Sequence, residues 1–108
     1  MPNVKIYIPA EKMPPDETLA DLAEQCSELC TVVLQAALVN VHIVYVAVRH
    51  GRGHPAFAEI QYRLEPFRTS AVMARFMEGL DEAISRKIGL TARIRCFGYE
   101  ASNIHARN

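Results

Sequence analysis

The stretch MPNVKIYIP, residues 1–9, decides the fold because it opens the chain with a strand that has one apolar face. Val4, Ile6 and Ile8 alternate with polar or amphipathic neighbours, and this period of two predicts a half-buried strand that Pro9 ends. A strand with one apolar face needs a second layer of structure over that face. The rest of the sequence supplies helices that can form this layer.

Two helices and three further strands are expected after the first strand. Apolar residues recur three and four apart in two segments, which is the spacing of a helix with one buried side. Runs rich in Val, Ile and aromatic residues predict the strands, and residues 99–108 form a polar tail. The predicted elements, in chain order, are a strand over 4–8, a helix capped by Asp16, strands over 39–48 and 56–64, a helix from Thr69 or Ser70 to Gly89, and a strand over 92–97.

This order of elements, β-α-β followed by β-α-β, predicts an α+β fold with two layers (α/β) in a single domain over residues 1–108. Two strands that are joined through a helix pair in parallel, with a right-handed crossover. We therefore expect two βαβ units to form one four-stranded mixed sheet, with both helices on one face. The other face of the sheet is then left without cover.

The composition restricts the classes of function that fit. Twelve Lys and Arg balance twelve Asp and Glu, and this zero net charge argues against a nucleic-acid partner. No apolar run reaches the roughly 18 residues of a membrane-spanning helix, and the first residues lack a signal-peptide pattern, so no membrane partner is expected. The three cysteines, Cys26, Cys30 and Cys96, favour reduced core thiols over a disulfide or a metal site, as in a cytoplasmic protein.

Strand alternation gathers charged side chains on the uncovered sheet face. Four cations and one carboxylate share this face, and the imbalance favours an anionic ligand because buried charges need partners. Arginine suits a carboxylate, since its guanidinium binds two oxygens at once. A solvated sheet face is the alternative, and the strand over 39–48 fits either face. The charged residues are Lys5, Glu59, Arg63, Arg93 and Arg95.

Pro2 gives the first strand a candidate catalytic group. Removal of the initiator Met would leave Pro2 with a free secondary amine. An α-amino group has an ordinary pKa of about 7.7–8.0, and both desolvation and nearby cations lower it. An amine that is neutral near pH 7 is suited to act as a general base. We expect Lys5, Arg63, Arg93 and Arg95 to lower the pKa of this amine.

Several features together resemble the tautomerase superfamily, in particular its 5-carboxymethyl-2-hydroxymuconate isomerase and macrophage migration inhibitory factor branches. They are the Pro2 strand, the βαβ duplication, the stretch from His54 to Thr69, and the ending Ala101-Ser102-Asn103-Ile104-His105-Ala106. The resemblance implies a homotrimer whose sheets pack into a barrel and enclose the charged face. It also implies that Pro2 moves a proton within a small keto or enol carboxylate, with no metal or organic cofactor.

The site residues of the family carry over unevenly. Pro2 matches the catalytic proline, and Arg68 falls where the isomerase branch has an arginine at the entry to its second helix. Arg93 and Arg95 fall where the inhibitory-factor branch has a tyrosine and an asparagine. The site lysine of that branch has no counterpart, because residues 31–38 hold no Lys or Arg. The predicted site is Pro2 as the catalytic base, with Arg93, Arg95, Arg68, Arg63 and Lys5 as substrate-binding residues and no metal.

We therefore predict a cofactor-independent tautomerase or isomerase of a small keto–enol carboxylate, active once Met1 is removed. Two alternatives stay open: decarboxylase or hydratase/dehalogenase chemistry on the same scaffold, and an inactive homologue with a binding or signalling role. Retention of Met1 would favour the inactive homologue, because the Pro2 nitrogen would then be an amide. Arg93 and Arg95 also fit a structural role as interface partners of Glu59, and Arg68 fits a solvated helix entry.

Overall fold

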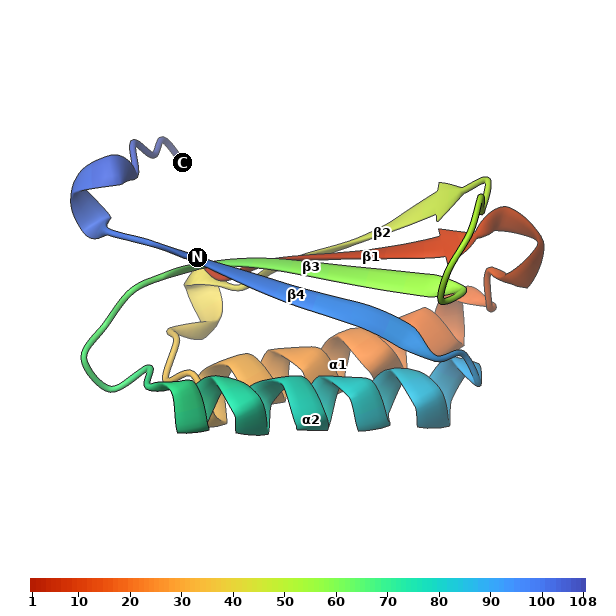
Figure 1. Cartoon of the computed structure of the whole chain (residues 1–108), viewed down its shortest axis with the longest axis horizontal. Helices are drawn as coiled ribbons and strands as arrows, with labels where there is room; N and C mark the ends of the chain where they lie inside the picture. Colours follow the sequence, from red (N-terminus) through yellow and green to blue (C-terminus); the bar gives the residue numbers. More distant parts are fainter.

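The computed structural model describes residues 1–108 as a four-stranded sheet with two helices packed against one of its faces (Figure 1). Both chain termini lie at one end of the sheet, and the carboxyl-terminal tail curls away on the side opposite the helices. Short 3₁₀ turns at Ala10–Lys12, Leu38–Asn40 and Ala101–Asn103 complete the chain. The strands are β1 (Asn3–Pro9), β2 (His42–Val48), β3 (Ala56–Arg63) and β4 (Ala92–Tyr99), and the helices are α1 (Asp16–Val32) and α2 (Ser70–Ile88).

The sheet has the strand order β2-β1-β3-β4. β1 and β2 are parallel and are joined through α1, and β3 and β4 are parallel and are joined through α2. β1 and β3 are antiparallel, and Asn3 pairs with Gln61, so the start of β1 lies beside the end of β3. The expected α+β fold, with two βαβ units in one mixed sheet and both helices on one face, is confirmed.

The two helices begin in different ways. Thr69 caps α2, as expected, because its hydroxyl oxygen accepts a 3.3 Å hydrogen bond from the Val72 amide. Gly89 ends α2 with a left-handed φ of 67°, a conformation that favours glycine. The expected cap at Asp16 is wrong: Pro15 holds the capping position without a side-chain bond, and Asp16 is the first helical residue. There the Asp16 carboxylate complements the positive end of the helix dipole.

Two strand boundaries differ by two residues or more from the expected ones, whereas β1 and the end of β3 differ by one residue. The strand expected from residue 39 begins only at His42, because the Asn40 amide donates a 2.9 Å hydrogen bond to the Ala37 carbonyl and closes a 3₁₀ turn. The last strand continues beyond residue 97 to Tyr99, whose carbonyl accepts a 2.9 Å hydrogen bond from the Leu64 amide. Backbone bonds from neighbouring segments thus set both boundaries, and the side-chain pattern alone does not show them.

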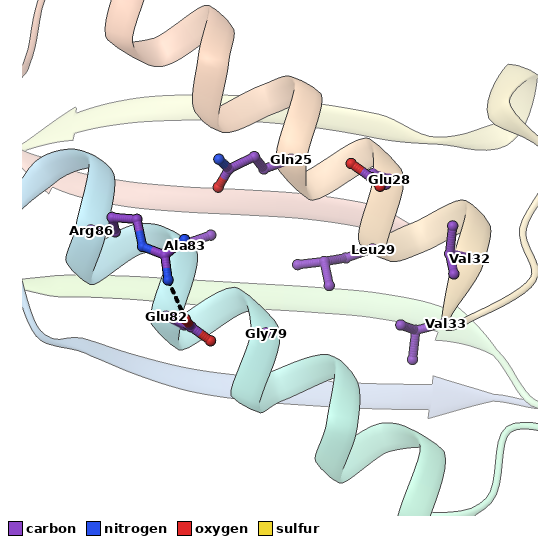
Figure 2. Close-up of a pocket in the computed structure, with 9 residues that line it drawn as sticks. All are labelled: Gln25, Glu28, Leu29, Val32, Val33, Gly79, Glu82, Ala83 and Arg86. Atoms are coloured by element: carbon purple, nitrogen blue, oxygen red, sulfur yellow. Dashed lines mark hydrogen bonds and ion pairs between the residues drawn. The ribbon is translucent and has the colours of Figure 1, made fainter.

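α1 and α2 lie side by side beneath the sheet (Figures 1 and 2). They approach closely at Gly79, where an added Cβ atom would lie 2.6 Å from Leu29 Cδ2. Glycine at this position therefore leaves room for the Leu29 side chain between the helices. No helix of the chain combines the length and the apolar character that crossing a membrane requires.

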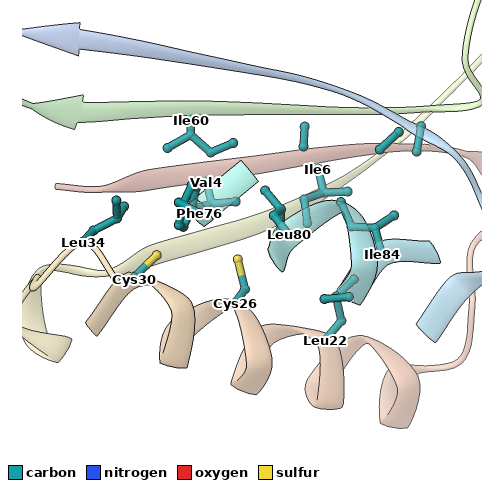
Figure 3. Packing of buried hydrophobic residues seen from close by; sticks show 14 of the residues in the cluster. Val4, Ile6, Leu22, Cys26, Cys30, Leu34, Ile60, Phe76, Leu80 and Ile84 are labelled. Carbon is teal, nitrogen blue, oxygen red and sulfur yellow. The ribbon is translucent and has the colours of Figure 1, made fainter. Parts of the chain in front are cut away.

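The core fills the space between the sheet and the helices (Figure 3). β1 contributes Val4, Ile6 and Ile8, as the alternation predicted, and each is at most 1% exposed. Cys26 and Cys30 of α1 are buried free thiols whose sulfur atoms point toward the sheet. No charged or polar side chain is buried in this layer, so the helix-covered face provides stability and no reactive group. α2 contributes five buried side chains to the core: Met73, Phe76, Leu80, Ala83 and Ile84.

Candidate active site

The uncovered face of the sheet presents its side chains in rows that the strand register sets. Residues that pair across neighbouring strands point to the same side of a sheet. Val44 of β2, Lys5 of β1, Glu59 of β3 and Arg95 of β4 form one such row. The register also settles the orientation of β2, which the sequence left open. Its residues on the uncovered face are His42, Val44, Val46 and Val48.

Pro2 lies at one end of the sheet, directly before β1 begins. Its side chain is buried, and its carbonyl oxygen accepts a 3.1 Å hydrogen bond from the His42 amide. The preceding residue, Met1, borders a cleft of about 400 Å³, which we call the amino-terminal cleft. Arg63 and Arg68 line the same cleft. Sheet pairing therefore fixes the start of the chain beside two cations.

Three separate segments form the walls of the amino-terminal cleft. The loop after α1 supplies Ala36 and Ala37, the segment before α2 supplies Phe67, and the tail supplies Ile104 and Ala106. The tail lies on the uncovered side of the sheet, near the start of the chain (Figure 1). Half of the lining residues are apolar, and Glu65 adds one carboxylate beside the two cations. A cleft that combines apolar surface with two cations suits a small organic acid, because ligand sites combine apolar surface with a few placed polar groups.

Arg68 is held in a fixed position at the cleft. Its Nε donates to the Leu34 carbonyl at 2.9 Å, and its Nη1 donates to the Arg63 carbonyl at 2.7 Å. Its guanidinium carbon lies 5.2 Å from the centre of the Phe67 ring. These bonds use two of the five N–H donors of an arginine, and neither ion pair of the chain includes Arg68. Arg68 is thus a half-buried, oriented cation with donors left for a ligand.

Both arginines act on the amino group at the start of the chain. Burial, followed by the charges of Arg63 and Arg68, lowers the pKa of the Met1 amino group below its ordinary value of 8.0. Burial also lowers the pKa of Arg68 itself. More of the amine is therefore neutral near pH 7 than at a free amino terminus. The sequence predicted that Lys5, Arg63, Arg93 and Arg95 lower the pKa of a free Pro2 amine; among these four, Arg63 acts on the Met1 amino group within one chain.

Lys5 and Arg95 lie in the middle of the uncovered face. The Lys5 Nζ atom is 3.9 Å from Glu59 Oε1, so these two side chains form an ion pair across β1 and β3. Arg95 is the register partner of Glu59, and its Nη1 donates to the carbonyl of Ile94 at 2.8 Å. Neither cation lines the amino-terminal cleft of its own chain.

Arg93 lies at the opposite end of the same face. Its register partner on β3 is Phe57, whereas Arg63 stands at the last position of that strand. The offset of six residues from Phe57 to Arg63 corresponds to about 20 Å at about 3.3 Å per residue. Within one chain, Arg63 and Arg68 line the amino-terminal cleft together with Met1, and Arg93 lies far from it along the strand.

A second cleft, of about 670 Å³, surrounds Arg93, and we call it the Arg93 cleft. The sequence showed the loop of residues 50–55 but gave it no role, because the loop holds two histidines without further metal ligands. The signal that could have found the cleft is the parallel register of β3 and β4, which sets this loop beside Arg93. Its other polar and aromatic lining residues are Tyr7, His50, Arg52, His54 and Phe57.

Solved structures with this arrangement of strands and helices are known, although no family model and no curated protein matches the sequence. A macrophage migration inhibitory factor-like protein from Entamoeba histolytica superposes with a TM-score of 0.78 at 13% identity, covering 98% of this chain and 95% of the other. A fused 4-OT symmetric trimer gives 0.80 at 16% identity, with 99% and 93% covered. Malonate semialdehyde decarboxylase gives 0.76 at 10% identity, with 99% and 92% covered.

The chain has the fold of these three structures. One of them is a named decarboxylase and another is a named trimer, and the resemblance expected from the sequence is thus confirmed at the level of the fold. At these identities the likeness concerns the backbone arrangement. The reaction and the site residues of this chain have to be argued from its own side chains.

The helix side of the fold offers no comparable site. A groove of about 350 Å³ runs between α1 and α2, where Glu82 and Arg86 form an ion pair one helical turn apart (Figure 2). The groove shares no lining residue with the amino-terminal cleft. Cys96 of β4 offers no nucleophile either, because burial raises the pKa of this thiol to about 11 and keeps it protonated near neutral pH.

The amino-terminal cleft therefore brings together groups with complementary chemistry. It holds a fixed chain start, an amino group with a lowered pKa and an oriented guanidinium with free donors. No three His, Cys, Asp or Glu side chains come together in the chain as a metal site would require. The groups that are present can bind a carboxylate, remove a proton and stabilise the resulting negative charge.

Proposed function

We propose that the chain is a cofactor-independent tautomerase or isomerase of a small keto–enol carboxylate, with Pro2 as the general base after removal of Met1. One observation carries the proposal: the start of the chain is fixed beside Arg63 and Arg68, and burial together with these two charges lowers the pKa of the Met1 amino group, next to the nitrogen that Pro2 would expose. A neutral amine next to an anion-binding pair is the arrangement that removal of a carbon-bound proton requires.

In the proposed reaction, the guanidinium of Arg68 holds the substrate carboxylate through its free donors. The Pro2 nitrogen takes a proton from the carbon next to the substrate carbonyl, and the electron pair of that C–H bond moves onto the carbonyl oxygen. Arg63 adds positive charge near the enolate that forms. The protonated Pro2 then returns the proton to the oxygen or to another carbon, so the substrate is isomerised and the enzyme is restored.

We also propose that the chain works as a homotrimer. Support comes from the trimeric fused 4-OT structures of the same fold and from the charged side chains that the sheet leaves uncovered. A trimer would let Arg93 and Arg95 of one protomer bind substrate in the amino-terminal cleft of a neighbour, with Lys5 at the border of the site. Without a neighbour, the offset of about 20 Å along β3 keeps Arg93 away from Pro2.

Covalent labelling of the amino terminus tests the base directly. A 3-halopropiolic acid is a small, reactive carboxylate, and we expect it to alkylate the Pro2 nitrogen once per chain and to abolish enol–keto turnover of a phenylpyruvate-type substrate. Arg68→Ala should raise the substrate KM, since a lost charged partner of a bound anion costs about 2–5 kcal/mol. Arg75→Ala, which removes an exposed arginine of α2, is the matched control. Full turnover by labelled protein would refute the proposal.

A decarboxylase is the second candidate. Two facts favour it: the fold likeness to malonate semialdehyde decarboxylase and the four arginines at the uncovered face and its edge, Arg63, Arg68, Arg93 and Arg95. Guanidinium groups would hold the carboxylate that leaves as CO₂ and stabilise the enolate left behind. Release of CO₂ from a small 3-oxo acid, with slow enol–keto turnover by the same preparation, would favour the decarboxylase over the isomerase.

A further inference from the structure

The Arg93 cleft lies at the end of the sheet away from the Pro2 of its own chain, and it shares only Arg93 with the site proposed for the trimer. At about 670 Å³ it has the size of a small-molecule site. β1, the end of β2, β3, β4 and the loop of residues 50–55 all contribute to its lining. The cleft therefore forms only when the four strands have assembled, and the loop alone does not make it.

The charge of the Arg93 cleft is uncompensated. Arg52 and Arg93 line it, no Asp or Glu does, and neither arginine takes part in an ion pair of the chain. His50 and His54 add two more nitrogen donors at the rim. A cleft with two free guanidinium groups and no acid favours an anionic ligand, and the fork of an arginine fits the oxygens of a carboxylate or a phosphate.

The floor of the Arg93 cleft is aromatic. The rings of Tyr7 and Phe57 stack with their centres 5.6 Å apart and their planes 17° from parallel. Both side chains stay half exposed on the uncovered face, and Arg93 is the register neighbour of Phe57. A stacked pair of this kind offers a flat apolar surface on which a further planar ring can pack.

The loop over this floor has a defined shape. The ring nitrogen Nε2 of His50 lies 3.1 Å from the Gly53 carbonyl oxygen, which closes the loop on itself. Gly53 has a φ of 97°, a conformation that only glycine adopts readily, so the turn that places Arg52 and His54 is specified by this residue. The loop thus holds its basic side chains around the aromatic floor.

We propose that the Arg93 cleft is a second binding site, for a planar aromatic ring that carries a carboxylate or a phosphate. Arg52 and Arg93 bind the oxyanion, and the ring packs on Tyr7 and Phe57. Apart from Arg93, these residues belong to no part of the proposed Pro2 chemistry. The site and the proposed reaction can therefore fail separately.

Binding to protein that retains Met1 tests this site without any contribution from a free proline. We would titrate phenyl phosphate and benzoate into isotope-labelled protein and follow backbone amide shifts by NMR. We expect shifts at residues 50–57 and at Arg93, and the stronger of the two ligands identifies the oxyanion. Methyl phosphate and acetate, which carry the same anions without a ring, should bind at least tenfold more weakly if the ring packs on the floor.

Substitutions then assign the contacts. Arg52 lies in an exposed loop, so its substitution should not disturb the fold. Arg52→Gln should weaken ligand binding about tenfold or more, which is the loss expected for one charge-assisted hydrogen bond. Tyr7→Leu should weaken binding of the ring-bearing ligands only. Arg75→Gln on α2 is the matched control and should leave binding unchanged. Shifts confined to residues 34–37 and 63–68, or equal affinity of the Arg52→Gln and Arg75→Gln proteins, would overturn the proposal.

Discussion

The two faces of the sheet carry opposite kinds of side chain, although the same strands build both. On β1, Val4, Ile6 and Ile8 are at most 1% exposed under the helices, whereas the Lys5 side chain between them stays 38% exposed on the other face. The difference teaches that strand alternation separates two tasks. One face fixes the fold through burial, and the other is free to carry charged side chains.

The largest expected effect is on the covered face. Phe76→Ala removes a fully buried ring of α2 and should lower the free energy of unfolding by about 3–5 kcal/mol, measured by urea denaturation. The neighbouring Arg75→Ala, on the exposed side of the same helix, should change it by no more than about 0.5 kcal/mol. Equal losses in the two variants would break the comparison.

A smaller loss of stability is expected at Gly98, where the covered face leaves no space for an added methyl group. A Cβ atom at Gly98 would lie 2.5 Å from Leu64 Cδ2 and 2.9 Å from Tyr62 Cζ, so Gly98→Ala should lower the free energy of unfolding by about 1–3 kcal/mol. Gly51→Ala is the matched control, since nothing lies within 4 Å of its added Cβ atom. Thermal unfolding of both variants would sharpen the comparison, and an unchanged midpoint for Gly98→Ala would contradict it.

The smallest expected effect is electrostatic, and it concerns the pKa of the amino group at the start of the chain. Arg63→Gln should raise the pKa of the Met1 amino group toward its ordinary value of 8.0, because the Arg63 charge is one cause of its lowering. The folded protein binds fewer protons there than the unfolded chain, so stability rises with pH between the lowered pKa and 8.0. In Arg63→Gln, the pH range over which stability rises should become narrower. NMR titration of protein that retains an isotope-labelled Met1 measures the pKa of this amino group.

For Arg75→Gln, which lies away from the amino-terminal cleft, the same titration should return the parent pKa. A parent-like pKa of the Met1 amino group in Arg63→Gln would show that the Arg63 charge does not contribute to its lowering.

The alternation of side chains made the fold predictable. Val4, Ile6 and Ile8 placed β1 under the helices, and Thr69 and Gly89 marked both ends of α2, because each of these signals is local. The cap at Asp16 was wrong, since Pro15 already takes the capping position. The turn before β2 was missed because its bonds are between backbone atoms, and these leave no pattern in the side chains.

The site was predictable in part. Alternation correctly put Lys5, Arg63, Arg93 and Arg95 on one face, but it gives no position along the strands. That position comes from the register, which sets Arg93 opposite Phe57 and leaves Arg63 at the end of β3. Arg68 lies outside any strand, and its two bonds to backbone carbonyls depend on how the loop after α1 meets the start of α2.

The measurement that tests the central claim most directly compares two preparations that differ only in Met1. One is expressed normally and shown by intact mass to begin at Pro2, and the other is expressed with methionine removal inhibited and shown to keep Met1. In the second preparation the Pro2 nitrogen is an amide and cannot accept a proton. We predict that only the first catalyses enol–keto turnover of a phenylpyruvate-type substrate, and equal rates in the two would contradict the role of Pro2 as the base.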